Sequence, residues 1–255
     1  MEKNFEIKKD DLCIKCRAYS YDFDYVDKVI ISCHGFTGSK DNKTANALAN
    51  ELKENDGYMI ISFDWPCHGD DKRKEVDLDV CNEYLKTVID YVHNTLDIDE
   101  IYGQGTSFGG YLILKYISEN GNPFEKITLR CPAVNMYDAL VNIILNDEQL
   151  NTINNGGVVY CGNDRDTVIT KKLVESLREN DILKRDFSNY SDKIVTIHGN
   201  KDTLIDYSVD KDFSERNGIE FITSEGTDHG FNVPGKIEEC ASLFMKYYSN
   251  NYKVK

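Results

Sequence analysis

Apolar residues follow two alternating patterns along the chain. Short runs rich in β-branched and aromatic residues predict strands at residues 29–33, 58–63, 126–130, 193–197 and 219–223. Several of these runs are apolar almost throughout, which is typical of strands covered on both faces. The opening residues, 5–24, alternate more loosely and predict an antiparallel hairpin at the edge of a sheet.

Between the runs, apolar residues recur at the spacing of an amphipathic helix. Three such helical faces are formed by Ala45, Leu48, Ala49 and Leu52, by Val80, Tyr84, Leu85, Val88 and Val92, and by Ile237, Ala241, Phe244 and Tyr248. Strands that alternate with helices predict an α/β fold with a mostly parallel central sheet and helices on both faces.

One interval, between a strand that ends near Val134 and the next strand at Lys193, is too long for a single crossover helix. It contains helical pieces at residues 137–145 and 171–178 and a hairpin-like stretch, GVVYCGNDRDTVIT. Because structureless loops of this length are rare in compact domains, residues 135–186 are predicted to form an inserted cap. Residues 1–134 and 187–255 then form the core domain.

Composition and charge limit the classes of molecule that the chain is expected to bind. The chain has 255 residues and a formal net charge of -14, which disfavours nucleic acid and anionic membrane surfaces and favours neutral substrates. The start of the chain has no apolar signal segment, and no apolar run is long enough to span a bilayer. The eight cysteines show no disulfide spacing, so we expect a reducing, cytoplasmic setting. The sequence leaves open whether the chain forms a homodimer.

The stretch GTSFG at residues 105–109 is a G-x-S-x-G motif between a short extended run and a helical one. In this context the motif is typical of a sharp turn that exposes a nucleophilic serine, here Ser107. The alternative is a glycine-rich turn whose serine only caps the helix, and the pentapeptide alone does not decide between them.

A nucleophilic serine needs a base and an acid that orients it. His229 follows a predicted strand and suits the base, whereas His198 ends an apolar run and is predicted to be a packed strand residue. Asp202 and Asp206 lie between the serine and the base, and both are candidates for the acid. Asp202 is at the turn after the strand, whereas Asp206 is predicted at a helix start, where it could act as the cap. Two backbone N–H groups, of Phe36 after Gly35 and of Phe108 after Ser107, are predicted to form an oxyanion hole.

Two cysteine patterns are not interpreted as functional sites. Cys13 and Cys16 form a C-x-x-C without a second ligand pair at zinc spacing, and Cys67 precedes His68 in a stretch where neighbours point to opposite faces. No metal and no cofactor are expected.

The motifs HGFTGSKDN, DWPCHGDD, GTSFGG, HGNKD and TDHGF, taken in order, resemble the α/β-hydrolase superfamily. Within it, they are similar to bacterial feruloyl (cinnamoyl) esterase-like serine esterases and also to monoacylglycerol lipase-like and serine-aminopeptidase-like members. The resemblance implies an α/β-hydrolase fold, Ser107 as nucleophile, His229 as base and Asp202 as acid. The chain departs from the family pattern at Cys67, where glycine is common, and at Asp206, where proline is common. Gly103 and Gln104 also stand where the family's strand is usually aliphatic.

The predicted function is hydrolysis of small neutral carboxylic esters through an acyl-enzyme, with hydroxycinnamate esters implied by the resemblance alone. An acylaminopeptidase, a thioesterase, an acyltransferase or a non-catalytic ligand-binding protein on the same fold are the alternatives. Tyr137, Asp138 and Tyr160 in the predicted cap are candidate substrate contacts, with packing as the other explanation for the two tyrosines. A histidine base predicts that kcat/KM rises with pH through about 6–7.

Overall fold

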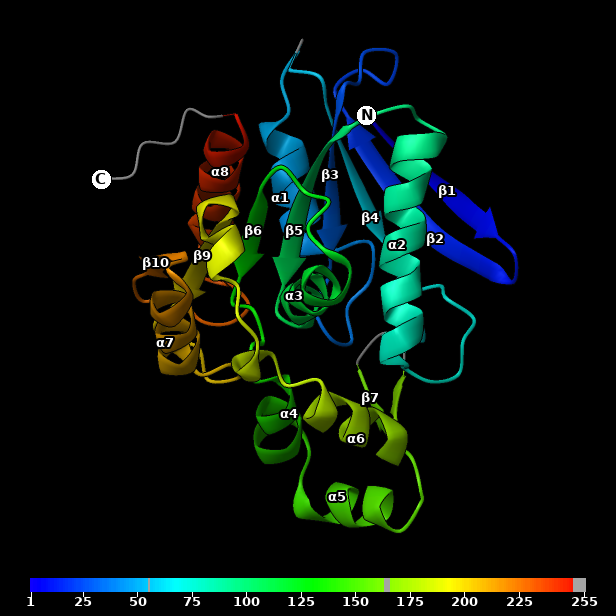
Figure 1. Cartoon of the computed structure of the whole chain (residues 1–255), viewed down its shortest axis with the longest axis vertical. Helices are drawn as coiled ribbons and strands as arrows, with labels where there is room; N and C mark the ends of the chain where they lie inside the picture. The colour runs from blue at the N-terminus through cyan, green and yellow to red at the C-terminus, as the bar shows by residue number, and fades with distance from the viewer. Residues whose placement is uncertain (55, 163–165, 250–255) are drawn as a thin grey trace.

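The fold is built on one sheet of eight strands (Figure 1). The computed structural model describes residues 1–54, 56–162 and 166–249. In spatial order the strands are β1 (Glu2–Lys9), β2 (Leu12–Ser20), β4 (Tyr58–Phe63), β3 (Lys28–Cys33), β5 (Glu100–Thr106), β6 (Ile127–Arg130), β9 (Ile194–Gly199) and β10 (Glu220–Ser224). The β1–β2 and β2–β4 pairs are antiparallel and the others parallel, so the predicted parallel sheet with an edge hairpin is confirmed.

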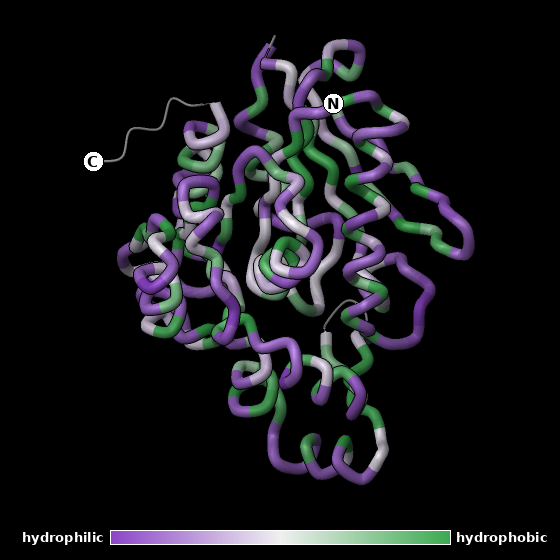
Figure 2. The backbone as a smooth tube through the Cα atoms, viewed as in Figure 1, coloured by the Kyte–Doolittle hydropathy of each residue, from purple (hydrophilic) through white to green (hydrophobic). Residues whose placement is uncertain are grey.

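Helices cover both faces of the sheet. On one side α1 (Lys43–Glu51) and α8 (Lys236–Tyr248) form one buried cluster, whereas α2 (Leu78–Asn94) and α3 (Phe108–Asn120) belong to a second. Strand β3 contributes to both, because Ile30 faces the first cluster while Val29 and Ile31 face the second. Figure 2 shows the hydrophobic stretches concentrated in the central strands. Among the described residues, no helix is long and apolar enough to cross a membrane.

Residues 135–186, which we call the cap segment, lie beyond the carboxyl ends of the central strands (Figure 1). The segment contains α4 (Met136–Ala139), a π-helical turn (Leu140–Ile144), α5 (Asp147–Asn154), the paired strands β7 (Val159–Cys161) and β8 (Thr167–Ile169), α6 (Lys171–Glu179) and a 3-10 turn (Ile182–Lys184). The predicted hairpin is present, although its residues 163–165 lie outside the described residues. Apolar side chains of the segment join the buried cluster of α2 and α3, and the division into a core and a cap stays a prediction.

The structure corrects several predicted boundaries. Strand β6 ends at Arg130, not near Val134, because Cys131 has a positive φ of 45° and Pro132 cannot continue the ladder. Strand β5 is longer than the short extended run predicted before the G-x-S-x-G motif, which covers only residues 100–102, and it continues through the glycines to Thr106. Helix α5 and a 3-10 turn (Ser188–Lys193) were not predicted, whereas α7 (Tyr207–Asn217) begins directly after Asp206, where a helix start was predicted. Both helices are mostly polar, so they lack a marked apolar period, although Asn146 and Gln149 form a capping box on α5.

Candidate active site

Ser107 occupies the sharp turn between β5 and α3. Its φ of 52° and ψ of -117° lie in a sparsely populated region, which costs about 1–3 kcal/mol. A Cβ on Gly105 would lie 2.6 Å from Cα of Gly110, and a Cβ on Gly109 would collide with the carbonyl of Cys33. The turn therefore has the backbone that the motif predicts, and its glycines are required by close approach of the strand and helix backbones.

The loop of residues 34–40, which we call the oxyanion loop, lies directly against this turn. A Cβ built on Gly35 would be 3.3 Å from Cβ and 3.9 Å from Oγ of Ser107. Phe108 is the first residue of α3, so its N–H has no acceptor within the helix. The ring of Phe36 packs on that of Phe108, with 5.5 Å between their centroids. Both predicted N–H donors thus belong to segments that meet at Ser107.

His34 and Trp65 hold the oxyanion loop in place. The Trp65 N–H donates to Nε2 of His34 at 3.3 Å, and its indole Nε1–H donates to the His34 carbonyl at 3.1 Å. Nδ1 of His34 lies 2.8 Å from the Gly35 carbonyl. Burial lowers the pKa of His34 to about 3, so its ring is neutral, with Nδ1 as donor and Nε2 as acceptor. His34 orders the loop through these hydrogen bonds.

The predicted base and acid meet at the same edge of the sheet. His229 follows β10 and Asp202 follows β9, and Nδ1 of His229 lies 2.6 Å from Oδ2 of Asp202. The side chain of Asp202 is fully buried, and that of His229 is 18% exposed. Asp206, the other candidate acid, instead caps α7, with Oδ1 accepting the Ser208 N–H at 2.8 Å. The structure therefore brings Asp202, and not Asp206, against His229.

The contact between Asp202 and His229 shifts their pKa values in opposite directions. Burial acts to raise the pKa of Asp202, but hydrogen bonds from His198 and His229 outweigh it and hold that pKa well below its usual range. For His229, burial acts to lower the pKa, whereas the hydrogen bond with Asp202 and the neighbouring thiol of Cys131 raise it to about 9. Asp202 is consequently ionised at neutral pH and stabilises a positive charge on His229.

Hydrogen bonds of Arg130 connect the β5–α3 turn to the loop that carries His229. The Ser107 N–H donates to the carbonyl of Arg130 at 3.0 Å, and Nη1 of Arg130 donates to the carbonyl of His229 at 2.6 Å. Arg130 is buried, and its Nε–H also donates to Thr44 at 3.1 Å. Sequence reasoning missed this residue, because a charged residue at a strand end carries no signal of what its side chain will reach.

A family model described as the alpha/beta hydrolase fold matches residues 28–203. The chain belongs to the α/β-hydrolase family. The resemblance drawn from the motifs is thus confirmed at the level of family and fold. No curated protein sequence matches the chain.

Solved structures agree on the fold of this α/β-hydrolase. Est1E from Butyrivibrio proteoclasticus is 16% identical, with a TM-score of 0.73 over 96% of this chain and 99% of its own; a further structure of Est1E contains ferulic acid. The esterase Pf2001 from Pyrococcus furiosus is 18% identical, with a TM-score of 0.68 over 98% of this chain and 92% of its own. XC6422 from Xanthomonas campestris, a serine hydrolase without a lid, is 15% identical, with a TM-score of 0.66 over 100% and 96%.

The site of this α/β-hydrolase includes a histidine whose hydrogen bonds the sequence did not predict. His198, on β9, is buried as expected for a strand residue, but its two ring nitrogens lie 2.7 Å from Asp210 and 3.0 Å from Asp202. The Sγ of Cys131, a ring nitrogen of His198 and a carboxylate oxygen of Asp202 lie within 4.8 Å of one another, which is close enough for a metal site. Because both nitrogens of His198 already face carboxylates, we interpret the cluster as a hydrogen-bond network.

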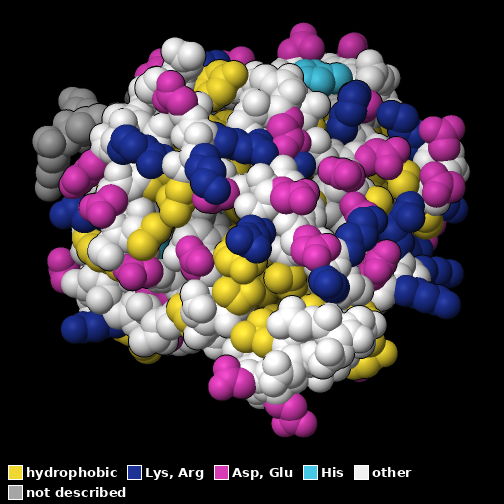
Figure 3. Space-filling model, turned by 60° about the horizontal axis from the view of Figure 1, so that its bottom comes forward, with side chains coloured by type: hydrophobic (Ala, Val, Ile, Leu, Met, Phe, Trp, Pro, Cys, Tyr) yellow, Lys and Arg dark blue, Asp and Glu magenta, His cyan; other side chains and the backbone are white. Residues whose placement is uncertain are grey.

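The candidate substrate contacts of the hydrolase line two separate hollows. Tyr137 and Asp138 line a cavity of about 210 Å³, together with Tyr111 and Asn135. Tyr160 is 58% exposed and lines a groove of about 530 Å³ between the β7–β8 hairpin and residues 72–80. Figure 3 shows apolar side chains among charged ones on the face that carries the cap segment.

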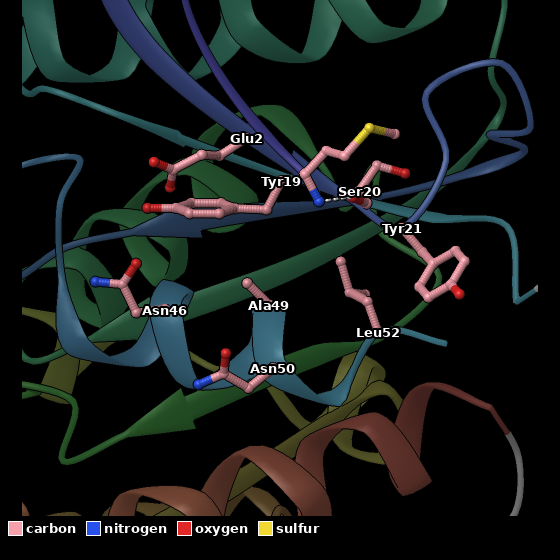
Figure 4. A pocket seen from close by; sticks show the side chains of 9 residues that line it. Glu2, Tyr19, Ser20, Tyr21, Asn46, Ala49, Asn50 and Leu52 are labelled. Atoms are coloured by element: carbon pink, nitrogen blue, oxygen red, sulfur yellow. Dashed lines mark hydrogen bonds between the residues drawn. The ribbon is translucent and has the colours of Figure 1, made fainter. Parts of the chain in front are cut away.

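A third hollow of about 330 Å³ lies between the start of the chain, the end of β2 and helix α1 (Figure 4). Its lining includes Glu2, Tyr19, Asn46 and Asn50, and Figure 4 shows these side chains directed into it from two sides. None of the predicted site residues lines this hollow, and we assign it no function.

Proposed function

We propose that this α/β-hydrolase is a serine esterase that acts through an acyl-enzyme. The observation that carries the proposal is the 2.6 Å contact between His229 and Asp202 at the sheet edge where the strained turn presents Ser107. Strands β5, β9 and β10 deliver the three residues to one edge, because parallel strands end on the same side.

In the proposed reaction, Oγ of Ser107 attacks the ester carbonyl carbon while Nε2 of His229 accepts the hydroxyl proton. The N–H groups of Phe36 and Phe108 stabilise the negative charge on the carbonyl oxygen, and the dipole of α3 acts in the same direction. His229 then protonates the leaving alcohol. Water, activated by His229, hydrolyses the acyl-enzyme and regenerates Ser107. Asp202 keeps Nδ1 of His229 protonated and oriented throughout.

The proposed substrates are small neutral esters. The net charge of -14 disfavours strongly anionic ones, and the likeness to Est1E, together with its ferulic acid complex, supports a hydroxycinnamate acyl group. The neutral character of the substrate rests on charge alone, whereas the aromatic acyl group rests on that likeness.

A fluorophosphonate probe and a set of matched substrates test this function. The probe is expected to label Ser107, and an ester is expected to turn over faster than the thioester or amide with the same acyl group. Absence of labelling in folded protein would favour a non-catalytic ligand-binding protein. Labelling with preferred cleavage of the amide, or of the thioester, would assign the site to the corresponding alternative class.

The pH dependence is expected to differ from that of an ordinary histidine base. His229 must be neutral to accept a proton, and its pKa is raised to about 9. Below this pKa the ring is protonated, so kcat/KM should fall as pH falls, and the midpoint should lie above pH 7 instead of at the 6–7 predicted from sequence. Measurement with a non-ionising ester from pH 5 to 10 checks this, and a midpoint below pH 6.5 would contradict it.

The cap segment is expected to affect acyl selectivity. Tyr137 is half-buried in the 210 Å³ cavity, which begins near the end of β6 and is also lined by Tyr111, one helical turn beyond Ser107. Tyr137→Ala should reduce kcat/KM for a hydroxycinnamate ester relative to an acetyl ester by roughly 5–150-fold, or about 1–3 kcal/mol, because an aromatic wall is lost.

Tyr160→Ala is the matched comparison, since that ring is largely exposed in a different groove. Melting curves of both variants separate selectivity from stability. Equal losses on both esters in both variants would contradict a pocket in the cap segment and leave these tyrosines with packing roles.

A further inference from the structure

His198 contacts two carboxylates in the interior of the protein. It lies on β9 with its side chain fully buried, as are the side chains of both partners. Nδ1 lies 2.7 Å from Oδ2 of Asp210, which is on α7, and Nε2 lies 3.0 Å from Oδ2 of Asp202. The oxygen of Asp202 that His198 contacts is the same oxygen that His229 contacts at 2.6 Å. One carboxylate oxygen is thus shared by two imidazoles.

The other oxygen of Asp202 is already engaged. Its Oδ1 accepts the backbone N–H groups of Leu204 at 2.8 Å and Ile205 at 3.0 Å. These two bonds hold Oδ1 in place. The groups at Oδ2 then determine how the rest of the carboxylate is oriented and which charges surround it. There the contacts come from His198 and His229.

The geometry at His198 determines its protons. Asp202 is ionised, so its Oδ2 accepts a hydrogen bond and Nε2 of His198 carries a proton. Burial raises the pKa of Asp210, and whenever Asp210 is ionised Nδ1 carries a proton as well, which makes the ring an imidazolium. Two carboxylates compensate its burial. Although burial acts to lower the pKa of His198, the bonds with Asp202 and Asp210 outweigh it and raise that pKa to about 12. The imidazolium therefore persists across the physiological range.

We propose that His198 is a positioning residue, an imidazolium that fixes Asp202 against His229 and sets how much of the carboxylate's negative charge His229 experiences. The inference rests on the proposed function, in which His229 is the base. Without the positive charge of His198, the full charge of Asp202 would act on His229 and hold its proton more tightly. With it, His229 releases that proton at a lower pH.

Other titratable groups around the two histidines are few among the described residues. Asp210 and Tyr207 face His198 from α7, with the Tyr207 ring edge-on at 5.7 Å, and Asp206 acts on it from the loop after β9. Cys131, after β6, lies beside both histidines, whose hydrogen bonds lower its thiol pKa against the effect of burial. Arg130, whose Nη1 donates to the His229 carbonyl at 2.6 Å, is a second cation beside the base. Its bond is to the backbone, whereas His198 supplies its positive charge at Oδ2 of Asp202.

Three variants separate the charge of His198 from its hydrogen bond. His198→Gln keeps an N–H donor for Asp202 but removes the charge, and Asp210→Asn weakens the hold on the proton. His198→Phe removes both the charge and the bond. Thr196→Val is the matched control, because Thr196 is on the same strand and its buried hydroxyl has no hydrogen-bond partner in the part of the chain that the structure describes.

The expected readout is a shift in pH dependence. In His198→Gln the midpoint of kcat/KM against pH should rise by about one unit or more, with a smaller change at the alkaline plateau. In Asp210→Asn the loss of one carboxylate should lower the pH at which His198 itself loses a proton. His198→Phe should also lower the plateau roughly 10- to 100-fold, because Asp202 loses its position. Thr196→Val should retain the wild-type profile. A lower plateau with an unchanged midpoint in His198→Gln would overturn the proposal.

Nuclear magnetic resonance tests the same inference without substrate. In the ¹⁵N-labelled wild-type protein, both ring nitrogens of His198 should carry protons from pH 6 to 9, and the titration of His229 should move to higher pH in His198→Gln. Neutral-ring nitrogen shifts for His198 would overturn the proposal even if no variant folds. If the wild type hydrolyses no ester, the proposed function fails, while the His229 titration still decides the role of His198.

Discussion

Replacement of Ser107 by alanine is expected to lower kcat/KM for ester hydrolysis by about 10⁴-fold or more and to leave the protein folded. The reason is that in the proposed mechanism this hydroxyl forms the covalent bond to the acyl group, and the described residues place no other hydroxyl on the apex of the β5–α3 turn. Alanine keeps a Cβ on the same strained backbone, so the turn loses its nucleophile without a change in shape. Steady-state kinetics and a melting curve of the purified variant measure both parts.

Ser118→Ala supplies a control on the same helix, since Ser118 is exposed near the end of α3 and far along it from the turn. It should retain wild-type kinetics and probe labelling. Substantial ester hydrolysis by folded Ser107→Ala, together with labelling by a fluorophosphonate, would show that another residue is the nucleophile and would refute the mechanism.

Asp202→Asn should lower kcat by roughly 10³–10⁴-fold, whereas Asp206→Asn should leave it within a few-fold of wild type. An asparagine at position 202 can turn an N–H toward Nδ1 of His229, which favours the wrong tautomer of the base. It also removes the charge that both imidazoles share at Oδ2. Asparagine at position 206 still caps α7, because asparagine and aspartate are about equally good at an N-cap.

The two variants change the same chemical group four residues apart, so each controls for the other. Kinetics at several pH values, together with thermal denaturation, separate loss of catalysis from loss of fold. Because the pKa of Asp202 is depressed, its contribution to stability is present above the ordinary aspartate pKa and is lost as pH falls through the depressed value. The reverse ranking of kcat for the two variants would reassign the acid to Asp206.

The sequence predicted the fold well because the central strands are buried on both faces. Every residue of a run such as Tyr58–Phe63 is buried, so the prediction does not depend on which face of the strand is turned to the core. The helices beside these strands have clear apolar periods. For helix α7 only the start at Asp206 was predicted, because only Phe213 and a few small or polar side chains of that helix are buried and they give no clear apolar period. Its extent became evident only from its packing on β9 and β10, which is a tertiary effect.

The candidate site divides in a similar way. Ser107, Asp202 and His229 belong to local motifs whose turns follow strands, so their chain positions could be predicted, although their catalytic roles stay predictions. His198 and Arg130 could not be found in this way. Each is an ordinary strand residue in sequence, and its importance arises from partners on other elements, Asp210 and the carbonyl of His229 respectively.

The bonds between Trp65 and His34 give the protein a natural optical reporter. Trp65 is the only tryptophan in the chain, its side chain is fully buried, and its indole N–H is bonded to the residue that begins the oxyanion loop. Fluorescence excited selectively in tryptophan therefore originates from one place, beside the loop, and not from the molecule as a whole. The order of this loop during substrate encounter or chemical denaturation can be followed in real time without attaching a dye.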